Sequence, residues 1–215
     1  MSKTNLILMA ILTLILITSC EKDEIEKQLV LTLQPDGNQG KDAVISKIVP
    51  DKNFGELEDI HLYAWTQDGM LNVNRVVIDF DLSSIPTDAQ IDRAFLSLYF
   101  NKNSRYGNEH SGDNRFIIQR ITSAWDESTV SWDTEPGTIT THRVSVDGSI
   151  DTAQDFTDID ITTLIRDVIE NKDNSYGLML KLENEAVYKR LLFASSDNQD
   201  KSLRPKLEVY YTLTE

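Results

Sequence analysis

The chain of 215 residues is poor in cysteine, proline, glycine and positive charge. Its 1 cysteine excludes a disulfide framework, a zinc site built on cysteines and a Cys-x-x-Cys redox pair. With 9 glycines and 5 prolines it is neither collagen-like nor of low complexity. Its 21 basic and 35 acidic residues give a formal net charge of −14. This charge argues against a nucleic-acid partner and against a polybasic contact with anionic lipid headgroups.

The longest apolar run lies near the N-terminus, over residues 6–17. It is too short to span a bilayer as a helix, which takes about 20 residues. Behind Lys3, such a run predicts a secretory signal peptide over residues 1–19. The run leads to Cys20 through Ile-Thr-Ser, which resembles the lipobox of bacterial lipoproteins, where the cysteine is lipidated and becomes residue one. The alternative is a soluble secreted protein with an unmodified cysteine.

Residues 21–28 are mostly charged and show no hydrophobic periodicity. We therefore predict a flexible acidic tether over residues 20–28 and a folded domain over residues 29–215. The stretch resembles the surface-export signal of lipoproteins of the Bacteroidota, and the alternative is a simple spacer. The resemblance implies an outer-membrane lipoprotein that is exposed on the cell surface.

Most of the remaining chain alternates apolar and polar residues in short runs between turn residues. In the run 73–82, for example, Val76, Ile78 and Phe80 share one face of a strand. Such runs recur as far as residue 213, at a spacing typical of a β-sandwich or barrel. We therefore predict one all-β domain.

One segment, over residues 160–171, has a helical period instead. Its apolar residues recur at the offsets of one helix face, Ile161, Leu164, Ile165, Val168 and Ile169. Asp160 is the expected N-cap. The sequence thus predicts one short α-helix in the C-terminal third, packed on the β domain with Leu164 and Val168 buried.

Several strings then resemble a known family. Residues 77–86 read VIDFDLSSIP, residues 94–99 read AFLSLY and residues 125–132 read WDESTVSW. With later strings at 160–165, 176–181, 193–196 and 203–209, they resemble in order the motifs of DNRLRE domains, carbohydrate-binding modules of the family 96 type. The resemblance covers about residues 42–211. It implies a jelly-roll β-sandwich that binds a polysaccharide without catalysis, alongside polysaccharide-degrading enzymes, with acidic glycans such as alginate as ligands.

The loop 101–115 carries the densest group of basic side chains, Lys102, Arg105, His110 and Arg115, together with Tyr106. An acidic glycan needs a local cationic patch of this kind, because the chain as a whole is strongly negative. Arg105, Tyr106 and His110 also suit a polysaccharide lyase, with arginine neutralising a uronate and tyrosine or histidine moving the proton. The third alternative is a mobile surface connection.

Two aromatic side chains, Tyr63 and Trp65, share one face of a predicted strand with His61. An aromatic row can stack against the apolar face of a pyranose, but it can equally be the core side of the sheet. Trp125 also has two possible roles. It can be a sugar platform, or it can fill space together with Trp132 under a turn that Asp126 closes.

Asp79 and Asp81 flank Phe80 and are expected on the strand face opposite the apolar row. With a third acidic loop they form a candidate structural Ca²⁺ site, and the alternative is a solvated strand face. No other cofactor is indicated.

The sequence contains no Gly-x-Ser-x-Gly elbow, no His-Glu-x-x-His pair and no phosphate-binding glycine loop. Three function hypotheses remain. The first is a non-catalytic surface lipoprotein that binds a polysaccharide, with candidate residues Tyr63, Trp65, Arg105, Tyr106, His110 and Arg115. The second is a lyase-like enzyme that uses the 101–115 loop. The third is a structural or adhesive protein that binds another protein.

The lipobox resemblance yields a direct test. Cys20→Ala removes the only thiol that acyl chains can modify, and each buried CH₂ of such chains contributes about 0.8 kcal/mol to membrane binding. We expect the variant to move from the membrane to the soluble fraction on ultracentrifugation. Continued sedimentation with membranes would show that the cysteine is not the anchor.

Overall fold

The computed structural model describes residues 26–214, so Cys20 and the predicted signal peptide lie outside the described residues. Over this range the chain forms strands, one α-helix and two short 3₁₀ helices. In order they are β1 (Glu26–Leu33), β2 (Lys41–Ser46), β3 (Asp59–Gln67), β4 (Met70–Asp79), β5 (Gln90–Leu98), β6 (Phe116–Ile121), β7 (Thr138–Val146), β8 (Phe156–Asp160), α1 (Thr162–Glu170), η1 (Lys172–Asn174), β9 (Leu178–Leu182), β10 (Lys189–Ala194), η2 (Lys201–Leu203) and β11 (Lys206–Thr214). None of the described helices is long and apolar enough to cross a membrane.

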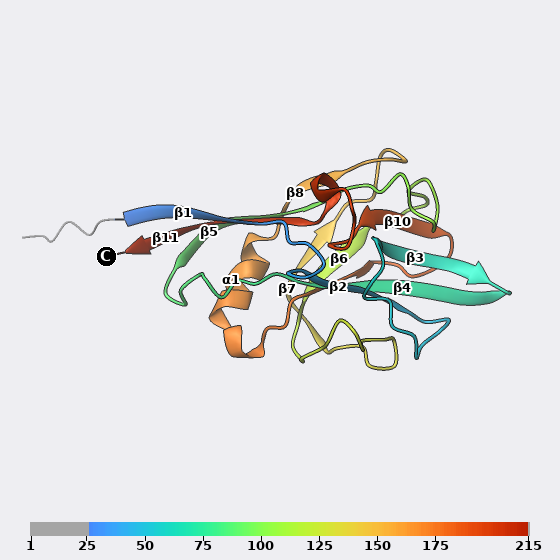
Figure 1. Cartoon of the computed structure of the whole chain (residues 1–215), viewed down its shortest axis with the longest axis horizontal. Helices are drawn as coiled ribbons and strands as arrows, with labels where there is room; N and C mark the ends of the chain where they lie inside the picture. Colours follow the sequence, from blue (N-terminus) through green and yellow to red (C-terminus); the bar gives the residue numbers. More distant parts are fainter. Residues whose placement is uncertain (1–25, 215) are drawn as a thin grey trace, which may run out of the picture.

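The strands pair antiparallel in two sheets. A 4-stranded sheet has the order β1-β11-β5-β8, and a 7-stranded sheet has the order β10-β3-β4-β9-β6-β7 with β2 paired to β4. In Figure 1, β1, β5 and β11 extend to the end where the described chain starts and stops, while the hairpin of β3 and β4 lies at the opposite end. The prediction of an all-β sandwich with one short helix is confirmed.

Side chains from both sheets meet in one main core. Leu96 of β5 and Val209 of β11 are fully buried there, as are Ile118 of β6 and Leu180 of β9. In β5 and β11 the apolar residues of the alternating pattern face inward. In β6 and β9 both faces are buried, with Ile121 and Met179 in a second apolar cluster, so the period-two pattern accounts for only part of the sandwich.

Strand β1 begins earlier than predicted. It pairs with β11 from Glu26 onward, opposite Thr214. Residues 26–28 are therefore part of the sheet and not of the tether predicted over residues 20–28, because backbone pairing with β11 does not require apolar side chains. Residues 20–25 lie outside the described range.

Helix α1 begins at Thr162, with Ile161 in the N-cap position, so Asp160 is not the N-cap. Asp160 still belongs to β8, where it pairs with Phe95. Its carboxylate accepts hydrogen bonds from the backbone N–H and the hydroxyl of Thr162. The backbone N–H of Ile161 is bonded to Ala94, so the chain leaves the sheet one residue later than expected.

The helix is docked as its period predicts, with Leu164, Ile165 and Val168 buried in the main core. A buried ion pair ties the helix to the large sheet, since Arg120 Nε of β6 donates to Asp167 Oδ2 at 2.6 Å. Figure 1 shows α1 beside the strands of both sheets. The helix is thus part of the core.

We expect Leu164→Ala to lower the free energy of unfolding by about 2–5 kcal/mol, because it removes a fully buried side chain and leaves a cavity. Chemical denaturation measures this loss. Glu170→Ala, on the exposed side of the same helix, is the matched control and should change stability by less than about 0.5 kcal/mol. Equal, small effects of the two changes would mean that α1 does not support the core.

A buried carboxyl lies in β2. Asp42 is 2% exposed, and its Oδ2 accepts the backbone N–H of Ser196 at 2.8 Å. Burial raises the pKa of Asp42 to about 7; the hydrogen bonds from Ser196 oppose this, and the charges of Asp197 and Glu127 add to it. The folded protein therefore holds the Asp42 proton more tightly than the unfolded chain does.

This difference predicts a dependence of stability on pH. The contribution of protonated Asp42 is fully present below pH about 4 and is lost as the pH rises through the folded value near 7. We expect the Tm of the wild type to fall as the pH rises through this window. In Asp42→Asn, which has no carboxyl to titrate, the Tm should fall less. Thermal unfolding of both proteins from pH 4 to pH 8, with the exposed Asp133→Asn as control, measures it. Parallel Tm curves for wild type and Asp42→Asn would contradict this assignment.

Candidate functional site

Strand β3 presents its two faces to different surroundings. Ile60, Leu62 and Ala64 are at most 1% exposed and belong to the main core. Because successive side chains of a strand alternate between its faces, His61, Tyr63 and Trp65 lie on the other face. The aromatic side chains of β3 therefore lie on the face of the sheet turned away from the main core.

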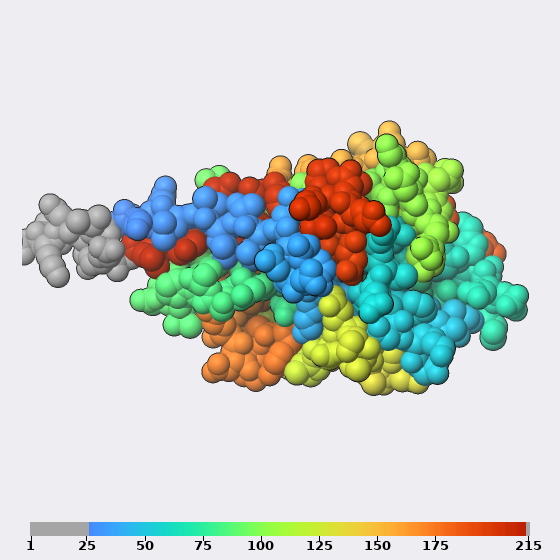
Figure 2. Space-filling model, in the orientation of Figure 1, coloured from blue at the N-terminus to red at the C-terminus, as the bar shows by residue number. Residues whose placement is uncertain are grey.

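Two more aromatic side chains extend this row. The ring of Tyr106, from the 101–115 loop, stacks on His61 with 4.2 Å between ring centroids. Tyr63 and Trp65 are 5.9 Å apart with nearly parallel rings, and Tyr188 meets Trp65 edge-on at 4.8 Å. We call Tyr106, His61, Tyr63, Trp65 and Tyr188 the aromatic row. Figure 2 shows the 101–115 loop (light green) lying against the hairpin of β3 and β4 (cyan).

A cavity of about 270 Å³ adjoins the row at His61, Tyr63 and Tyr106. One part of its wall is apolar and comes from β2 and the segment after it, including Phe54 and Leu57. The rest is polar and uncharged, formed by Ser46, Gln67, Asn72 and Asn74. An apolar cavity with a few converging polar groups is the usual form of a small-molecule site.

Burial sets the charge state of the row. It lowers the pKa of His61 to about 3, so the ring is neutral at physiological pH. Burial also raises the pKa of the Tyr63 and Tyr106 hydroxyls, with arginine side chains acting in the opposite direction. The row and its cavity are thus uncharged, and their recognition chemistry is hydrogen bonding and ring contact.

One cation stands beside the row. The guanidinium carbon of Arg190 lies 5.7 Å from the centre of the Trp65 ring. Arg190 Nε donates to the backbone oxygen of Glu109 and Nη1 to that of Tyr106, so the same side chain holds the 101–115 loop against β10. Arg190, Tyr188 and Asn74 were not predicted from the sequence. Tyr188 and Arg190 are two residues apart, which places them on the same face of a strand, but the sequence does not show that Arg190 pairs with Tyr63 on the neighbouring strand.

The model of carbohydrate-binding module family 96 matches residues 36–211, most of the chain. The chain belongs to this family. A search of curated proteins found no significant match. The family assignment confirms the resemblance of the sequence motifs and supports carbohydrate binding as the general function.

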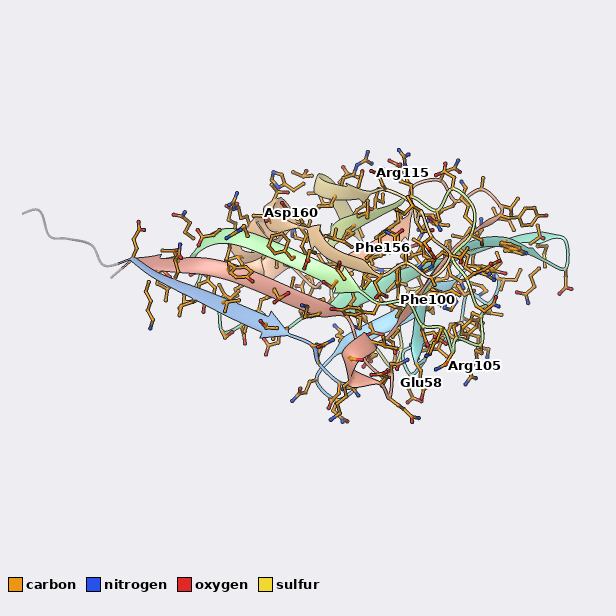
Figure 3. All side chains as sticks on the ribbon, turned by 90° about the horizontal axis from the view of Figure 1, so that it is seen from above. Glu58, Phe100, Arg105, Arg115, Phe156 and Asp160 are labelled. Carbon is orange, nitrogen blue, oxygen red and sulfur yellow. The ribbon has the colours of Figure 1, made fainter. Side chains whose placement is uncertain are left out.

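In this module the predicted basic patch does not form. Figure 3 shows Arg105 and Arg115 on opposite sides of the molecule, with Arg105 next to Glu58. Arg105 and Lys102 line a hollow whose other members include the acidic residues Glu56, Glu58, Asp59 and Asp200. Arg115 Nε lies 3.9 Å from the carboxylates of Asp147 and Glu183. Acidic side chains from distant segments offset both arginines, which the local sequence does not show.

His110, the fourth member of that patch, is a core residue. It is 2% exposed and packs against the rings of Phe100 and Phe193. Its Nε2 is 2.9 Å from the backbone oxygen of Gln154, and its Nδ1 accepts the N–H of Leu192. Burial lowers its pKa. With both ring nitrogens engaged, His110 supplies neither a surface cation nor a proton carrier.

Among residues 26–214 no third acidic ligand stands beside the two aspartates of the predicted Ca²⁺ site. Asp79 lies 4.0 Å from Lys41 Nζ, and Asp81 accepts the N–H of Ser83. Both line a larger cavity of about 490 Å³ beside α1, together with Lys41 and Lys172. Between residues 26 and 214 no group of three or more His, Cys, Asp or Glu side chains is arranged to hold a metal. The two carboxylates do not fit a Ca²⁺ site, because lysines and not a third acidic loop stand beside them.

Trp125 and Trp132 fill space under their turn, as one of the two alternatives predicted. Both pack against a second apolar cluster of buried residues, Ala43, Ile45, Val77, Ile121, Val130 and Met179. Trp125 Nε1 donates to the backbone oxygen of Tyr176 at 2.7 Å. Asp126 closes the turn by accepting the N–H of Ser128. The cluster also covers the Val77 face of β4, so that face is not simply solvated.

Proposed function

We propose that this module is a non-catalytic, cell-surface lipoprotein that binds a polysaccharide along the aromatic row. The observation that carries the proposal is the row itself, in a member of a carbohydrate-binding family. Tyr63 and Trp65 are half-buried on the face of β3 that the main core does not use, and Tyr188 is 53% exposed. Neighbouring aromatic side chains that are exposed together on one surface are typical of binding sites.

The chemistry of the row suits a sugar. A pyranose has one apolar face, which stacks on an aromatic ring, and a rim of hydroxyls, which need hydrogen-bond partners. The row supplies the rings, and the amides of Gln67, Asn72 and Asn74 supply uncharged partners next to it. Tyrosine and tryptophan combine an apolar body with a polar tip, which is why they serve at such half-wet surfaces.

An acidic glycan such as alginate is the ligand class to test first. The net charge of −14 repels a polyanion at long range, so a cation is needed where the polymer lies. Arg190 next to Trp65 is the cation that the row offers, and it too has an acidic neighbour, because its Nη2 lies 4.0 Å from Glu109 Oε1. Polysaccharide-degrading enzymes acting alongside are the proposed partners.

The positions of His110 and Tyr106 favour binding without catalysis. The lyase alternative needs His110 or Tyr106 as a proton carrier beside an arginine. His110 is buried with both nitrogens engaged, and burial raises the pKa of the Tyr106 hydroxyl, which leaves less of it as the phenolate that could accept a proton. An absorbance assay for new unsaturated uronates is expected to show no activity.

The layout of the sandwich suits a surface anchor. Glu26, the first described residue, lies at the end of the molecule opposite the hairpin of β3 and β4 (Figure 1). A lipid on Cys20 would hold the chain by that first end and leave the row facing away from the membrane.

Trp65→Ala tests the proposal. We expect at least a tenfold loss of affinity for the bound polysaccharide, about 1.4 kcal/mol, because it removes the ring that contacts both Tyr63 and Tyr188 in the row. Affinity electrophoresis and calorimetry against alginate and a neutral β-glucan measure it. Trp125→Ala is the matched control, expected to lower the Tm but to leave the affinity unchanged. Loss of binding in Trp125→Ala with none in Trp65→Ala would place the site under the other turn.

A further inference from the structure

The cavity beside the aromatic row contains two buried polar atoms with no partner. His61 Nε2 and Asn74 Nδ2 are hydrogen-bonded at 2.8 Å. Their other polar atoms, His61 Nδ1 and Asn74 Oδ1, have no hydrogen-bond partner among residues 26–214. Both residues line the cavity, and they are only 2% and 7% exposed. Buried polar atoms are rarely left unbonded, since each costs about 1–3 kcal/mol, so this pair calls for a function.

The pair offers one donor and one acceptor, whichever way the histidine and the amide are oriented. If the Asn74 amide N–H donates to His61 Nε2, the His61 proton is on Nδ1 and the free Asn74 atom is an oxygen. If the amide is flipped, His61 Nε2 donates to the Asn74 oxygen; the free histidine nitrogen is then an acceptor and the free amide nitrogen a donor. The result requires only that His61 carries a single ring proton, as its burial ensures.

A donor and an acceptor in one cavity select their ligand groups by chemistry. A hydroxyl both donates and accepts, so the hydroxyls of one sugar ring can satisfy each of the two atoms. A carboxylate and an ester oxygen only accept, and an ammonium only donates, so each would leave one buried atom unbonded. Sites that hydrogen-bond a hydroxyl reject analogues that lack it far more strongly than apolar pockets reject an extra group.

We propose that the cavity binds one sugar ring of the polysaccharide, and that free hydroxyls on one edge of this ring form hydrogen bonds with His61 and Asn74. This inference rests on the proposed function and adds a specificity to it. The volume of about 270 Å³ is below the range of about 300–1,000 Å³ typical of drug-sized ligands, so a single ring fits and a chain does not. Neighbouring rings then lie along Trp65 and Tyr188, where a uronate carboxylate meets Arg190.

Tyr106 is the side chain that controls access. Its ring stacks on His61 and lines the same cavity, and the two unbonded atoms are closed off from solvent. A hydroxyl therefore reaches them when the Tyr106 ring shifts along His61. This assigns the 101–115 loop a part in recognition through its tyrosine and not through its arginines.

O-acetylation of the polysaccharide tests the inference on the wild-type protein. Alginate and a neutral β-glucan are each compared, by calorimetry, with the same polymer after chemical O-acetylation, which converts hydroxyls to esters. We expect binding of the acetylated form to be at least tenfold weaker. Equal affinity for both forms would overturn the hydroxyl-reading pocket and leave polysaccharide binding standing, whereas no binding of any polymer would overturn both.

The double variant His61→Phe, Asn74→Leu localises the effect. It replaces both members of the pair by apolar groups of similar shape, a change that is often neutral for stability. We expect its Tm to stay close to that of the wild type, its affinity for the plain polymer to fall at least tenfold, and its preference over the acetylated form to disappear. Retained preference would overturn the inference. Should the variant not fold, the acetylation comparison on the wild type decides.

Gln119→Leu is the matched control. Gln119 of β6 is a buried amide whose oxygen also lacks a partner among the described residues, but it does not line the cavity. Its replacement should leave both the affinity and the preference for the plain polymer unchanged. An equal loss in Gln119→Leu would show that the double variant acts through the sheet and would overturn the assignment to the pocket.

Discussion

The burial of one face of β3 is the constraint on which the candidate site depends. Ile60, Leu62 and Ala64 are held in the main core, so a shift of the strand by one residue would exchange its two faces and bury the aromatic residues instead. The cost of exposing three apolar side chains keeps the register fixed. Hydrophobic burial on one side thus determines that Tyr63 and Trp65 are presented on the other.

Much of the fold is readable from the sequence because its cause is local. The period-two runs predict the strands, and the offsets of Leu164 and Val168 predict the docked helix. The family motifs predict the sandwich and its class of ligand. The errors in this part are at element ends, at Glu26 and Asp160, where backbone pairing continues past the point at which the side-chain pattern stops.

The candidate site is less readable, because its parts meet only across the sheet. Tyr63 lies opposite Arg190 on one side and Asn74 on the other, and Tyr106 reaches the same place from a loop. Alternation in β3 does not show which of its two faces is turned to the main core, because that depends on how the strand packs in the folded sheet. The prediction of the basic patch is wrong because it, too, depends on contacts between distant segments. Arg105 and Arg115 are close in sequence, yet each is surrounded by carboxylates that arrive from far away in the chain.

Two buried histidines show that hydrogen-bond partners, and not the extent of burial, distinguish a structural side chain from one that can bind a ligand. His61 and His110 are both 2% exposed and both have a lowered pKa. His110 has a partner on each ring nitrogen and so locks the 101–115 loop to β10. His61 has a partner on one nitrogen only, and the other stands in a cavity that a loop tyrosine covers. His110, which is fully hydrogen-bonded, thus positions the loop that carries Tyr106. His61 keeps one ring nitrogen free to bind a ligand that enters the cavity beside this loop.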